Sequence, residues 1–268
     1  MRQYLSELTP DKNGRIEISG KDFKYLTQVL RLKCGSILDV RFQDNSIKAM
    51  QVCELKQKSV VLELCSESSN TESGVKAQDL FESAVAEPEI WIMQFLPKSS
   101  VMDDVVRHAV ECGAYAVLPV TGEYSKEGSA SASKVERWQR IVKEARQQCG
   151  SRVDTKIYPP VSLDEALLLW NEEKEKHSSE DVKAYLHHEM PQKNQKGVFA
   201  LKKKCTRVCL AVGTEGGISE SELQKLLQND FEVLHFNTNV MRVDTACLYG
   251  LAVIQHALTE FASWHTQE

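Results

Sequence analysis

The segment Val208–Glu222 constrains the fold of this chain more than any other, because it has the pattern of a buried strand, a glycine turn and a capped helix in succession. Val208–Val212 is an apolar run of the kind that forms a central strand. Three glycines follow it, and glycine permits positive φ and close approach of the backbone to a ligand. They are Gly213, Gly216 and Gly217. Ser219 and Glu222 have the spacing of a capping box that starts a helix. The pattern is compatible with either a ligand-binding loop or a tight turn, and it lacks the Gly-Lys-Ser/Thr of a Walker loop.

A second polar loop leads into a long apolar helix near the C-terminus. Phe231–Phe236 predicts a strand, and Asn237–Asn239 is prone to turns. Apolar residues then recur at helical spacing from about Asp244 onwards. Arg242, Asp244 and Thr245 gather where this helix begins. One interpretation is structural, with Asp244 or Thr245 capping the helix and Arg242 as an ion-pair partner, and the other is a functional site.

The first 65 residues predict a small β-barrel, because short strands alternate with turn signals. The strands are expected at Arg15–Ile18, Ser36–Phe42, Ile47–Val52 and Ser59–Leu64. A short helix is expected over Phe23–Leu32. Ser66–Gly74 is polar and lacks periodicity, so it predicts a domain boundary between residues 1–72 and 73–268.

Strands and helices alternate after this boundary, which predicts an α/β domain with a mostly parallel sheet. Besides the two strands above, the sheet is expected to hold Glu89–Leu96, Ala114–Val120 and Val182–Leu186. Helices are expected from Ser99 or Ser100 to Gly113, over Lys134–Gln148, and from the capping box at Ser162 to Asn171 or beyond. Glu172–Asp181 is expected to be a loop.

Composition excludes several classes of protein. With 42% hydrophobic and 26% charged residues the chain can bury an ordinary core. It shows no apolar signal-peptide core and no apolar run of membrane-spanning length. Eight cysteines occur without a Cys-x-x-Cys pair, so we expect reduced cysteines that mostly pack in the interior, no zinc site or other metal, and a cytoplasmic protein.

A basic stretch stands out in a chain whose net charge is −5. Lys134–Lys156 holds seven basic residues and three acidic ones, which gives a local charge of +4. Such a stretch is either a solvated helix face or an RNA-binding surface. In the predicted helix the basic residues flank an apolar seam, so they can be exposed while the helix packs.

Several segments resemble a known family. Gly213-Thr-Glu-Gly-Gly217, with its following Ser and Glu, resembles the Gly-Pro-Glu-Gly-Gly signature of the methyltransferases that modify N3 of a uridine in small-subunit (16S) ribosomal RNA. Val240-Met-Arg-Val-Asp-Thr-Ala246 resembles the end of that family's Leu-Gly-x-Arg-x-Leu-Arg-x-Glu-Thr-Ala. Further collinear matches extend the resemblance over nearly the whole chain. They are Val29–Gly35, Leu96–Lys98 with Met102 and Glu111–Gly113, and Arg137–Cys149.

The resemblance implies a SPOUT methyltransferase domain with a trefoil knot, an N-terminal PUA-like β-barrel that binds RNA, and a homodimer with its site near the subunit interface. It implies S-adenosylmethionine as cofactor and ribosomal RNA, within the small ribosomal subunit, as partner. Arg242 is the expected stabiliser of negative charge on the base, and Glu215 and Asp244 are alternative catalytic carboxylates. The expected cofactor-binding residues are Leu186, His187, Val212, Gly213, Gly216, Gly217, Asn237, Val240, Met241 and Thr245. The expected RNA-binding residues are Arg31, Lys98, Arg137, Arg140, Lys143 and Arg152.

The chain departs from the family pattern at several positions. Thr214 replaces the signature proline, and Phe236–Asn239 replaces Leu-Gly-x-Arg. Gln147 replaces an acid, Ser151 an arginine, and Gly122–Ser125 the family's Ser-Glu-Arg-Ser. Asparagine is the best substitute for glycine at positive φ, which makes the loss of the family's glycine in this segment less severe. Two other functions stay open: a non-catalytic RNA-binding or ribosome-assembly factor, and a SPOUT methyltransferase with another RNA target such as a ribose 2′-hydroxyl.

Overall fold

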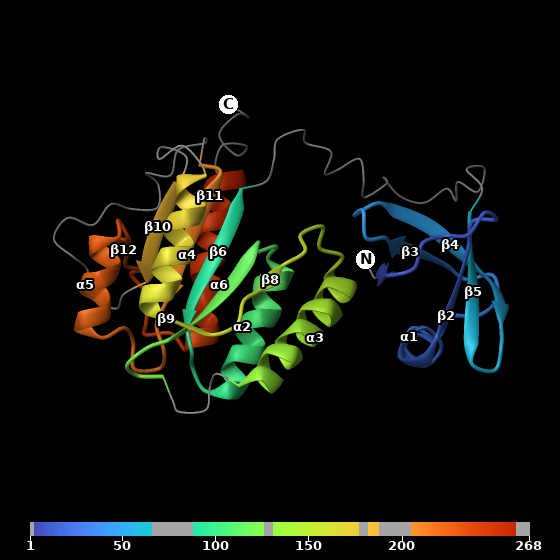
Figure 1. The fold of residues 1–268 in the computed structure, drawn as a ribbon, viewed down its shortest axis with the longest axis horizontal. Coiled ribbons are helices and arrows are strands. Elements are labelled where there is room, and N and C mark those ends of the chain that lie inside the picture. Colours follow the sequence, from blue (N-terminus) through green and yellow to red (C-terminus); the bar gives the residue numbers. More distant parts are fainter. Residues whose placement is uncertain (1–2, 66–87, 126–130, 177–181, 188–204, 261–268) are drawn as a thin grey trace. The chain divides into compact units, whose positions relative to one another are not determined.

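The computed structural model describes residues 3–65, 88–125, 131–176, 182–187 and 205–260 (Figure 1). The chain divides into two compact units. The first comprises Met1–Ser83 with Gln147–Arg152, and the second Ala84–Arg146 with Val153–Glu268. The boundary expected between residues 72 and 73 lies within residues 66–87, outside the described residues.

The first unit is built on a five-stranded sheet with the order β1-β3-β4-β5-β2. Its strands are β1 (Gln3–Leu5), β2 (Arg15–Ser19), β3 (Ile37–Arg41), β4 (Ile47–Leu55) and β5 (Ser59–Leu64). β1 pairs with β3 in parallel, and the other neighbours are antiparallel. Alternate residues of β2 are buried, as a sheet with one face on a core requires. In the described part of the chain β1 and β2 do not pair, so this sheet is open where a closed barrel was expected.

One short helical segment packs on this sheet. Helix α1 (Gly20–Lys24) continues into a π-helical turn, η1 (Tyr25–Val29), and Leu26 of that turn is fully buried. The helix expected over Phe23–Leu32 therefore begins and ends about three residues earlier in the structure than the sequence indicated.

The second unit is an α/β fold around a parallel sheet of order β12-β10-β11-β6-β7-β8, with β9 also pairing with β7. The strands are β6 (Glu89–Phe95), β7 (Ala116–Thr121), β8 (Lys156–Ile157), β9 (Val161–Ser162), β10 (Val182–His187), β11 (Arg207–Val212) and β12 (Glu232–Leu234). β6 and β11 are central, and their almost continuous burial explains their apolar sequences.

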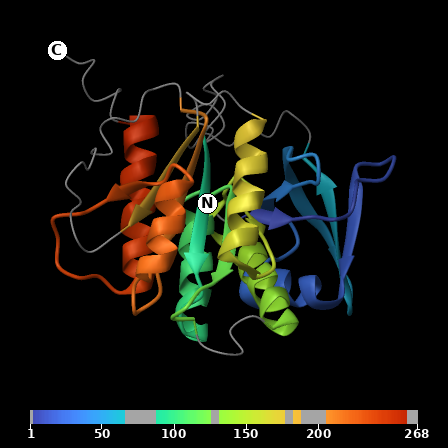
Figure 2. The ribbon, with the colours of Figure 1, turned by 60° about the vertical axis from the view of Figure 1, so that its left-hand side comes forward.

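Helices cover both faces of this sheet (Figures 1 and 2). The α-helices in the described part of this unit are α2 (Ser99–Glu111), α3 (Ala132–Cys149), α4 (Leu163–Glu175), α5 (Glu220–Gln228) and α6 (Val243–Gln255), which runs on into a π-helical turn, η3 (His256–Glu260). α2, α3 and α6 share one core with the sheet, and α4 and α5 share the other. Gly113 follows the C-cap residue of α2, and its φ of +70° gives the left-handed turn that closes the helix.

The amino end of β11 carries a buried ion-pair cluster. Arg207 is 5% exposed, pairs with Glu89 and Glu173, and lies over the Trp91 ring at 5.7 Å from its centroid. The positive charge of Arg207 is therefore compensated within the fold by two carboxylates and is not available to a ligand. The glycine loop that follows β11 lies at the opposite, carboxyl end of the sheet.

Some expected features differ from the structure. α4 continues to Glu175, so the loop expected from Glu172 begins later. The short strands β1, β8 and β9 have no counterpart among the expected elements. All eight cysteines are free thiols, but only Cys205, Cys209 and Cys247 are buried, so the expectation that most of them pack in the interior is wrong. None of the described helices combines the length with the hydrophobicity that a membrane-spanning segment requires.

Candidate active site

One cavity of about 780 Å³ lies at the carboxyl end of the parallel sheet in the second unit. Its wall is formed by the loop after β11, the segment between β12 and α6, and the start of α2. The residues that line it include Lys98, Ser100, Asp104, Val212, Gly213, Glu215, Gly216, Gly217, His235, Val240, Met241, Arg242 and Asp244. In a parallel sheet this is the edge at which ligands bind.

The loop after β11 is held in a tight turn by its own backbone. Thr214 N donates to Gly217 O at 3.1 Å, and Gly217 N donates back to Thr214 O at 2.9 Å. Gly217 has a φ of +83°, which only glycine adopts readily. A Cβ on Gly213 would lie 2.6 Å from the Gly217 carbonyl carbon. Both glycines are therefore required by the turn itself.

Thr214 takes a specific part in this turn although the resembling family has proline there. Its hydroxyl accepts a hydrogen bond from Gly216 N at 3.2 Å and donates to Gly217 O at 3.3 Å. Proline restricts a turn through its ring, whereas threonine restricts this one through local side-chain hydrogen bonds. The substitution thus keeps the loop ordered by a different physical means.

Gln94, on the neighbouring strand β6, holds the start of the same loop by hydrogen bonds. It is fully buried at the end of β6, and its Nε2 donates to the carbonyl oxygens of Val212 and Gly213 at 3.2 and 3.1 Å. These carbonyls leave the sheet ladder where the strand ends, so a buried side-chain donor satisfies them. Sequence reasoning missed Gln94, for which the signal was one polar residue in an otherwise apolar central strand.

Glu215 projects from the glycine loop toward the start of α2. Its Oε1 accepts a hydrogen bond from Lys98 N at 3.2 Å, and Lys98 is the N-cap residue of that helix. A carboxylate at a helix N-terminus is favoured by the unpaired backbone N–H groups there. Lys98, which was expected to bind RNA, thus lines the cavity and orients Glu215 through its backbone.

Arg242 and Asp244 stand at the start of α6. Arg242 occupies the N-cap position without capping the helix through its side chain, and it is exposed. In the described part of the chain Arg242 makes no ion pair with Asp244 or any other carboxylate. The structural interpretation, with one residue capping the helix and the other pairing with it, is therefore not what the structure shows. Both charged groups line the cavity instead.

The segment between β12 and α6 does not need a residue with positive φ at Asn237. Among the described non-glycine residues, positive φ occurs at Arg31, Asn45 and Asp230, and hence not at Asn237. The loop is fixed instead by a Thr238 N to Phe236 O hydrogen bond of 2.7 Å. The Phe236 ring also packs edge to face on Tyr249 of α6, with centroids 4.9 Å apart.

The remaining expected cofactor residues are not among the described residues that line the cavity. Asn237 and Thr245 are exposed neighbours of lining residues and do not line the cavity themselves. Leu186 and His187 end β10 beside β11 and β12, and their side chains lie outside what the structure describes. Asp104, Ser100 and His235 line the cavity and were not expected, because only the fold brings α2 and the end of β12 to this loop.

The basic residues expected to bind RNA lie outside the cavity except for Lys98. Arg137 and Arg140 are exposed on α3, but Arg137 forms an ion pair with the buried carboxylate of Asp103. Lys143 and Arg152 are partly exposed. Arg31 is exposed in the first unit with a φ of 55°, an uncommon conformation for a residue with a side chain. Within the described ranges no cluster of three or more His, Cys, Asp or Glu residues could hold a metal ion.

The chain is similar to ribosomal RNA methyltransferases over nearly its whole length. The RNA methyltransferase domain family matches residues 85–255. Ribosomal RNA small subunit methyltransferase E of Bacillus subtilis is 23% identical over 269 residues and spans 96% of each chain. The protein of the same name from Buchnera aphidicola is 22% identical over 254 residues, which cover 94% of this chain and 91% of the relative.

Solved structures show the same fold. Ribosomal RNA small subunit methyltransferase E from Neisseria gonorrhoeae, bound to S-adenosyl methionine, superimposes with a TM-score of 0.74 at 21% identity. The match covers 95% of this chain and 97% of that one. A methyltransferase from Legionella pneumophila in complex with the cofactor SAM gives a TM-score of 0.72 at 23% identity, with 96% of both chains covered.

Proposed function

The chain belongs to the RNA methyltransferase domain family, and on that premise we propose that it methylates N3 of a uridine in small-subunit (16S) ribosomal RNA with S-adenosylmethionine as methyl donor. One observation carries the proposal. A single cavity brings together the Gly213–Gly217 loop, the segment before α6, and the charged side chains of Arg242, Glu215 and Asp244. The names of the full-length relatives support ribosomal RNA as the substrate.

The cavity suits S-adenosylmethionine in size and lining. Its volume of about 780 Å³ lies within the roughly 300–1,000 Å³ that is usual for small-molecule sites. Backbone without side chains lines part of the wall at the glycine loop, which lets a ligand approach closely. When bound, this cofactor supplies an electrophilic methyl group. We propose that Val212–Gly217 and Asn237–Met241, with Thr245 and the β10 end at Leu186 and His187, surround it.

Arg242 is proposed to stabilise the charge that develops on the base. Methylation at N3 of uridine requires loss of the imide proton, after which negative charge spreads over N3 and the two flanking carbonyl oxygens. A guanidinium held beside these atoms stabilises them more than it stabilises the neutral base, which lowers the barrier. Arg242 is suited to this role because it faces the cavity and makes no ion pair within the described residues.

Two carboxylates at the cavity are candidates for taking the N3 proton. Glu215 is oriented by Lys98 N, and Asp244 lies in the first turn of α6. Either group can accept a proton at hydrogen-bond distance from N3, and the other then orients Arg242 or the base. Comparing Glu215→Gln with Asp244→Asn separates the two. Loss of the base should remove the titration of that carboxylate from the pH profile of the transfer step, whereas loss of the orienting group should lower the rate and keep the profile.

The RNA must present the uridine outside a stacked helix, because N3 is otherwise engaged in base pairing. We propose that six cations hold the phosphates around it: Arg31, Lys98, Arg137, Arg140, Lys143 and Arg152. The first unit, residues 1–72 in this proposal, acts as a PUA-like RNA-binding domain. Residues 73–268 form a SPOUT domain with a trefoil knot, and two copies of the chain form a homodimer with the cavity near the interface.

Methyl transfer to RNA tests this function directly. Small ribosomal subunits without base methylation are incubated with the protein and labelled S-adenosylmethionine, and the product is mapped by mass spectrometry. A methyl group on N3 of a 16S uridine is the expected result. Transfer to another position or another RNA would mean that the protein is a methyltransferase whose substrate differs from the one proposed. If the protein neither bound the cofactor nor transferred a methyl group, a non-catalytic RNA-binding factor would be favoured. The altered Phe236–Asn239 segment would then explain the loss of cofactor binding.

A further inference from the structure

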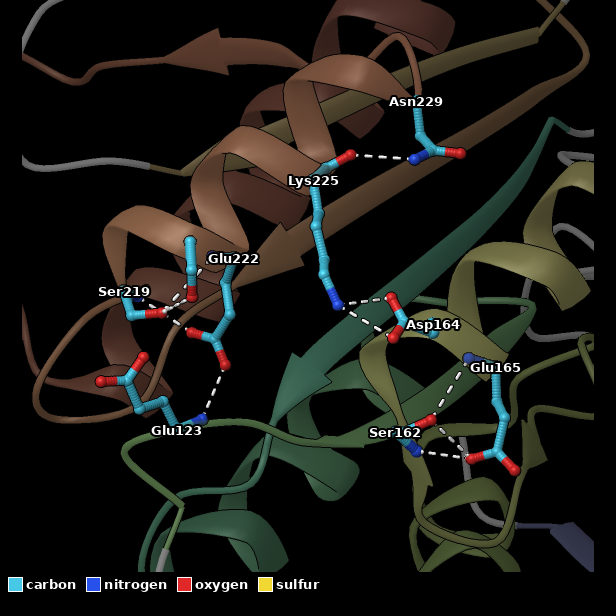
Figure 3. Close-up of polar contacts among 9 residues, drawn as sticks. Glu123, Ser162, Asp164, Glu165, Ser219, Glu222, Lys225 and Asn229 are labelled. Carbon is cyan, nitrogen blue, oxygen red and sulfur yellow. Dashed lines mark hydrogen bonds and ion pairs between the residues drawn. The ribbon is translucent and has the colours of Figure 1, made fainter.

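Two helices of the second unit begin with the same reciprocal hydrogen bonds but in different surroundings (Figure 3). At the start of α4 the Ser162 hydroxyl accepts from Glu165 N, and the Glu165 carboxylate accepts from Ser162 N. At the start of α5 Ser219 and Glu222 repeat this arrangement. Glu165 is exposed, whereas Glu222 is only 8% exposed. A capping box is normally a surface device, so the burial of Glu222 points to a further contact.

That contact joins two loops which are far apart in the sequence. Glu222 Oε2 accepts from Ser219 N at 2.9 Å, while Oε1 accepts from Glu123 N at 2.6 Å (Figure 3). Glu123 lies in the turn after β7, and Ser219 follows the glycine loop after β11. Each oxygen of this buried carboxylate thus satisfies a backbone N–H from a different segment. A charge-assisted hydrogen bond of this kind is stronger than one between neutral groups.

The turn after β7 also packs on the cavity wall. A Cβ on Gly216, which lines the cavity, would lie 3.3 Å from the Tyr124 ring, so this ring and the glycine are already in close contact. Gly122 has even less room, because its Cβ would lie 2.5 Å from both Glu222 Oε1 and Phe95 Cδ1. The turn therefore fits closely between the Glu222 carboxylate and the glycine loop.

We propose that Glu222 is a positioning residue for the proposed reaction, which fixes the Gly213–Gly217 wall of the cofactor cavity by joining it to the turn at Gly122–Tyr124. The inference rests on the proposed function for the identity of the ligand. The connection between the two loops through Glu222 rests on hydrogen bonds that are present without any ligand. Glu222 does not line the cavity, so it acts through Ser219 on one side and through Glu123 and Tyr124 on the other.

The two capping boxes supply a matched pair of variants. Both hydrogen bonds at Glu165 go to Oε2, from Ser162 N at 2.8 Å and Ser162 Oγ at 2.7 Å. Glutamine at 165 can therefore keep the cap with its single carbonyl oxygen. Glutamine at 222 can satisfy only one of the two backbone N–H groups, and its NH₂ then faces the other as a second donor. Glu222→Gln breaks the joining contact at nearly constant size, whereas Glu165→Gln does not.

Two measurements on the full chain test the proposal. Hydrogen exchange of the cofactor-free protein should be faster in peptides that contain residues 121–125 and 213–219 in Glu222→Gln, and unchanged there in Glu165→Gln. Calorimetric titration with S-adenosylmethionine should show binding roughly fivefold weaker in Glu222→Gln, because part of the binding free energy is then spent on ordering the loosened loop. Gly122→Ala keeps Glu222 but displaces its carboxylate, so it should reproduce both effects.

The outcomes separate this inference from the proposed function. Equal exchange and equal cofactor affinity in the wild type, Glu222→Gln and Glu165→Gln would overturn the positioning role. The same result for Gly122→Ala would overturn it even if Glu222→Gln did not fold. No binding of S-adenosylmethionine by the wild type would instead overturn the proposed function. Even in that case, faster exchange confined to residues 121–125 and 213–219 of Glu222→Gln would support the role of Glu222 in holding the two loops together.

Discussion

At the scale of single residues, the proposed chemistry depends on one cation that has no carboxylate partner among the described residues. Arg242 faces the cavity at the start of α6, and within the described residues it has no carboxylate partner. We predict that Arg242→Ala lowers the rate of single-turnover methyl transfer by about 10²–10³-fold, the cost of removing one charge-stabilising donor. The dissociation constant for S-adenosylmethionine should change by less than the rate does.

The conservative variant sharpens this prediction. Arg242→Lys keeps the charge but not the planar set of donors, so it should restore part of the rate without reaching that of the wild type. A transfer rate in Arg242→Ala equal to that of the wild type would remove Arg242 from the mechanism. A fall in cofactor affinity as large as the fall in rate would make it a binding residue instead.

Buried thiols give a prediction about alkaline pH. Burial, with smaller contributions from Cys112 and Asp244, raises the pKa of Cys247 to about 12, and burial also raises the pKa of Cys209. Between the unfolded thiol pKa of about 8.5 and these raised values, only the unfolded state loses the proton. The free energy of unfolding should therefore fall as pH rises, by about 1 kcal/mol per pH unit for each thiol.

Urea denaturation between pH 9 and 11 measures this slope. Tryptophan fluorescence reports the right unit, because Trp91, Trp138 and Trp170 are buried in the second unit. Cys247→Ala and Cys209→Ala should each make the loss of stability with pH less steep. If both variants kept the full slope of the wild type, titration of the buried thiols would not be its cause.

The sequence predicted the backbone chemistry of the glycine loop better than its side-chain chemistry. Gly213 and Gly217 are needed for reasons visible in the sequence, since only glycine suits a positive φ or a contact at 2.6 Å. The hydroxyl bonds of Thr214 and the negative φ of Asn237 were not visible. Both depend on how the turn closes on itself, and a residue type only limits the conformations available.

At the scale of helices and strands, the sequence predicted features that depend on neighbouring residues and missed those that depend on distant ones. The capping boxes at Ser162 and Ser219 and the cap at Gly113 are confirmed, because each depends on residues within one turn of a helix. The short strands β1, β8 and β9 went unpredicted, because such strands exist only through pairing with distant partners. The reach of Glu222 to Glu123 is of the same kind, since it spans 99 residues of sequence.

Helix α3 carries the prediction that belongs to this scale. Replacing Arg140 and Lys143 with glutamine removes two positive charges and keeps a good helix former. If both contact phosphates, the slope of log affinity for 16S ribosomal RNA against log salt should become shallower by roughly 1.4–1.8. Arg137 is left in place because its loss would leave the buried Asp103 carboxylate unpaired.

A control on another helix distinguishes local contact from net charge. Lys225 on α5 is exposed and pairs only at the surface with Asp164, so its replacement by glutamine costs little stability. Lys225→Gln should leave the salt slope for RNA unchanged. Because Lys225→Gln removes one charge and the α3 variant two, a change of slope half as large in Lys225→Gln would mean that overall charge, and not the α3 surface, governs the affinity.

At the scale of the whole molecule, the change of pattern near residue 66 predicted two units of different construction. The first is built on a mainly antiparallel sheet and the second on a parallel one, as the spacing of strands and helices indicated. Closure of the first sheet into a barrel was not determined by local sequence. Closure requires pairing of the edge strands β1 and β2, and the identity of edge strands depends on the full topology.

The proposed function requires both units to bind one RNA, and this gives a prediction for the whole molecule. Arg31 belongs to the first unit and Arg140 to the second. Arg31→Gln and Arg140→Gln should each weaken binding of 16S ribosomal RNA and each reduce the salt slope by roughly 0.7–0.9. Because the two sites lie in separate units, the free-energy losses of the double variant should add. Binding of S-adenosylmethionine should be unchanged in all three variants, since neither residue lines the cavity.

A loss of RNA affinity confined to Arg140→Gln would mean that the second unit binds the RNA without help from Arg31. The PUA-like role of the first unit would then lose its support.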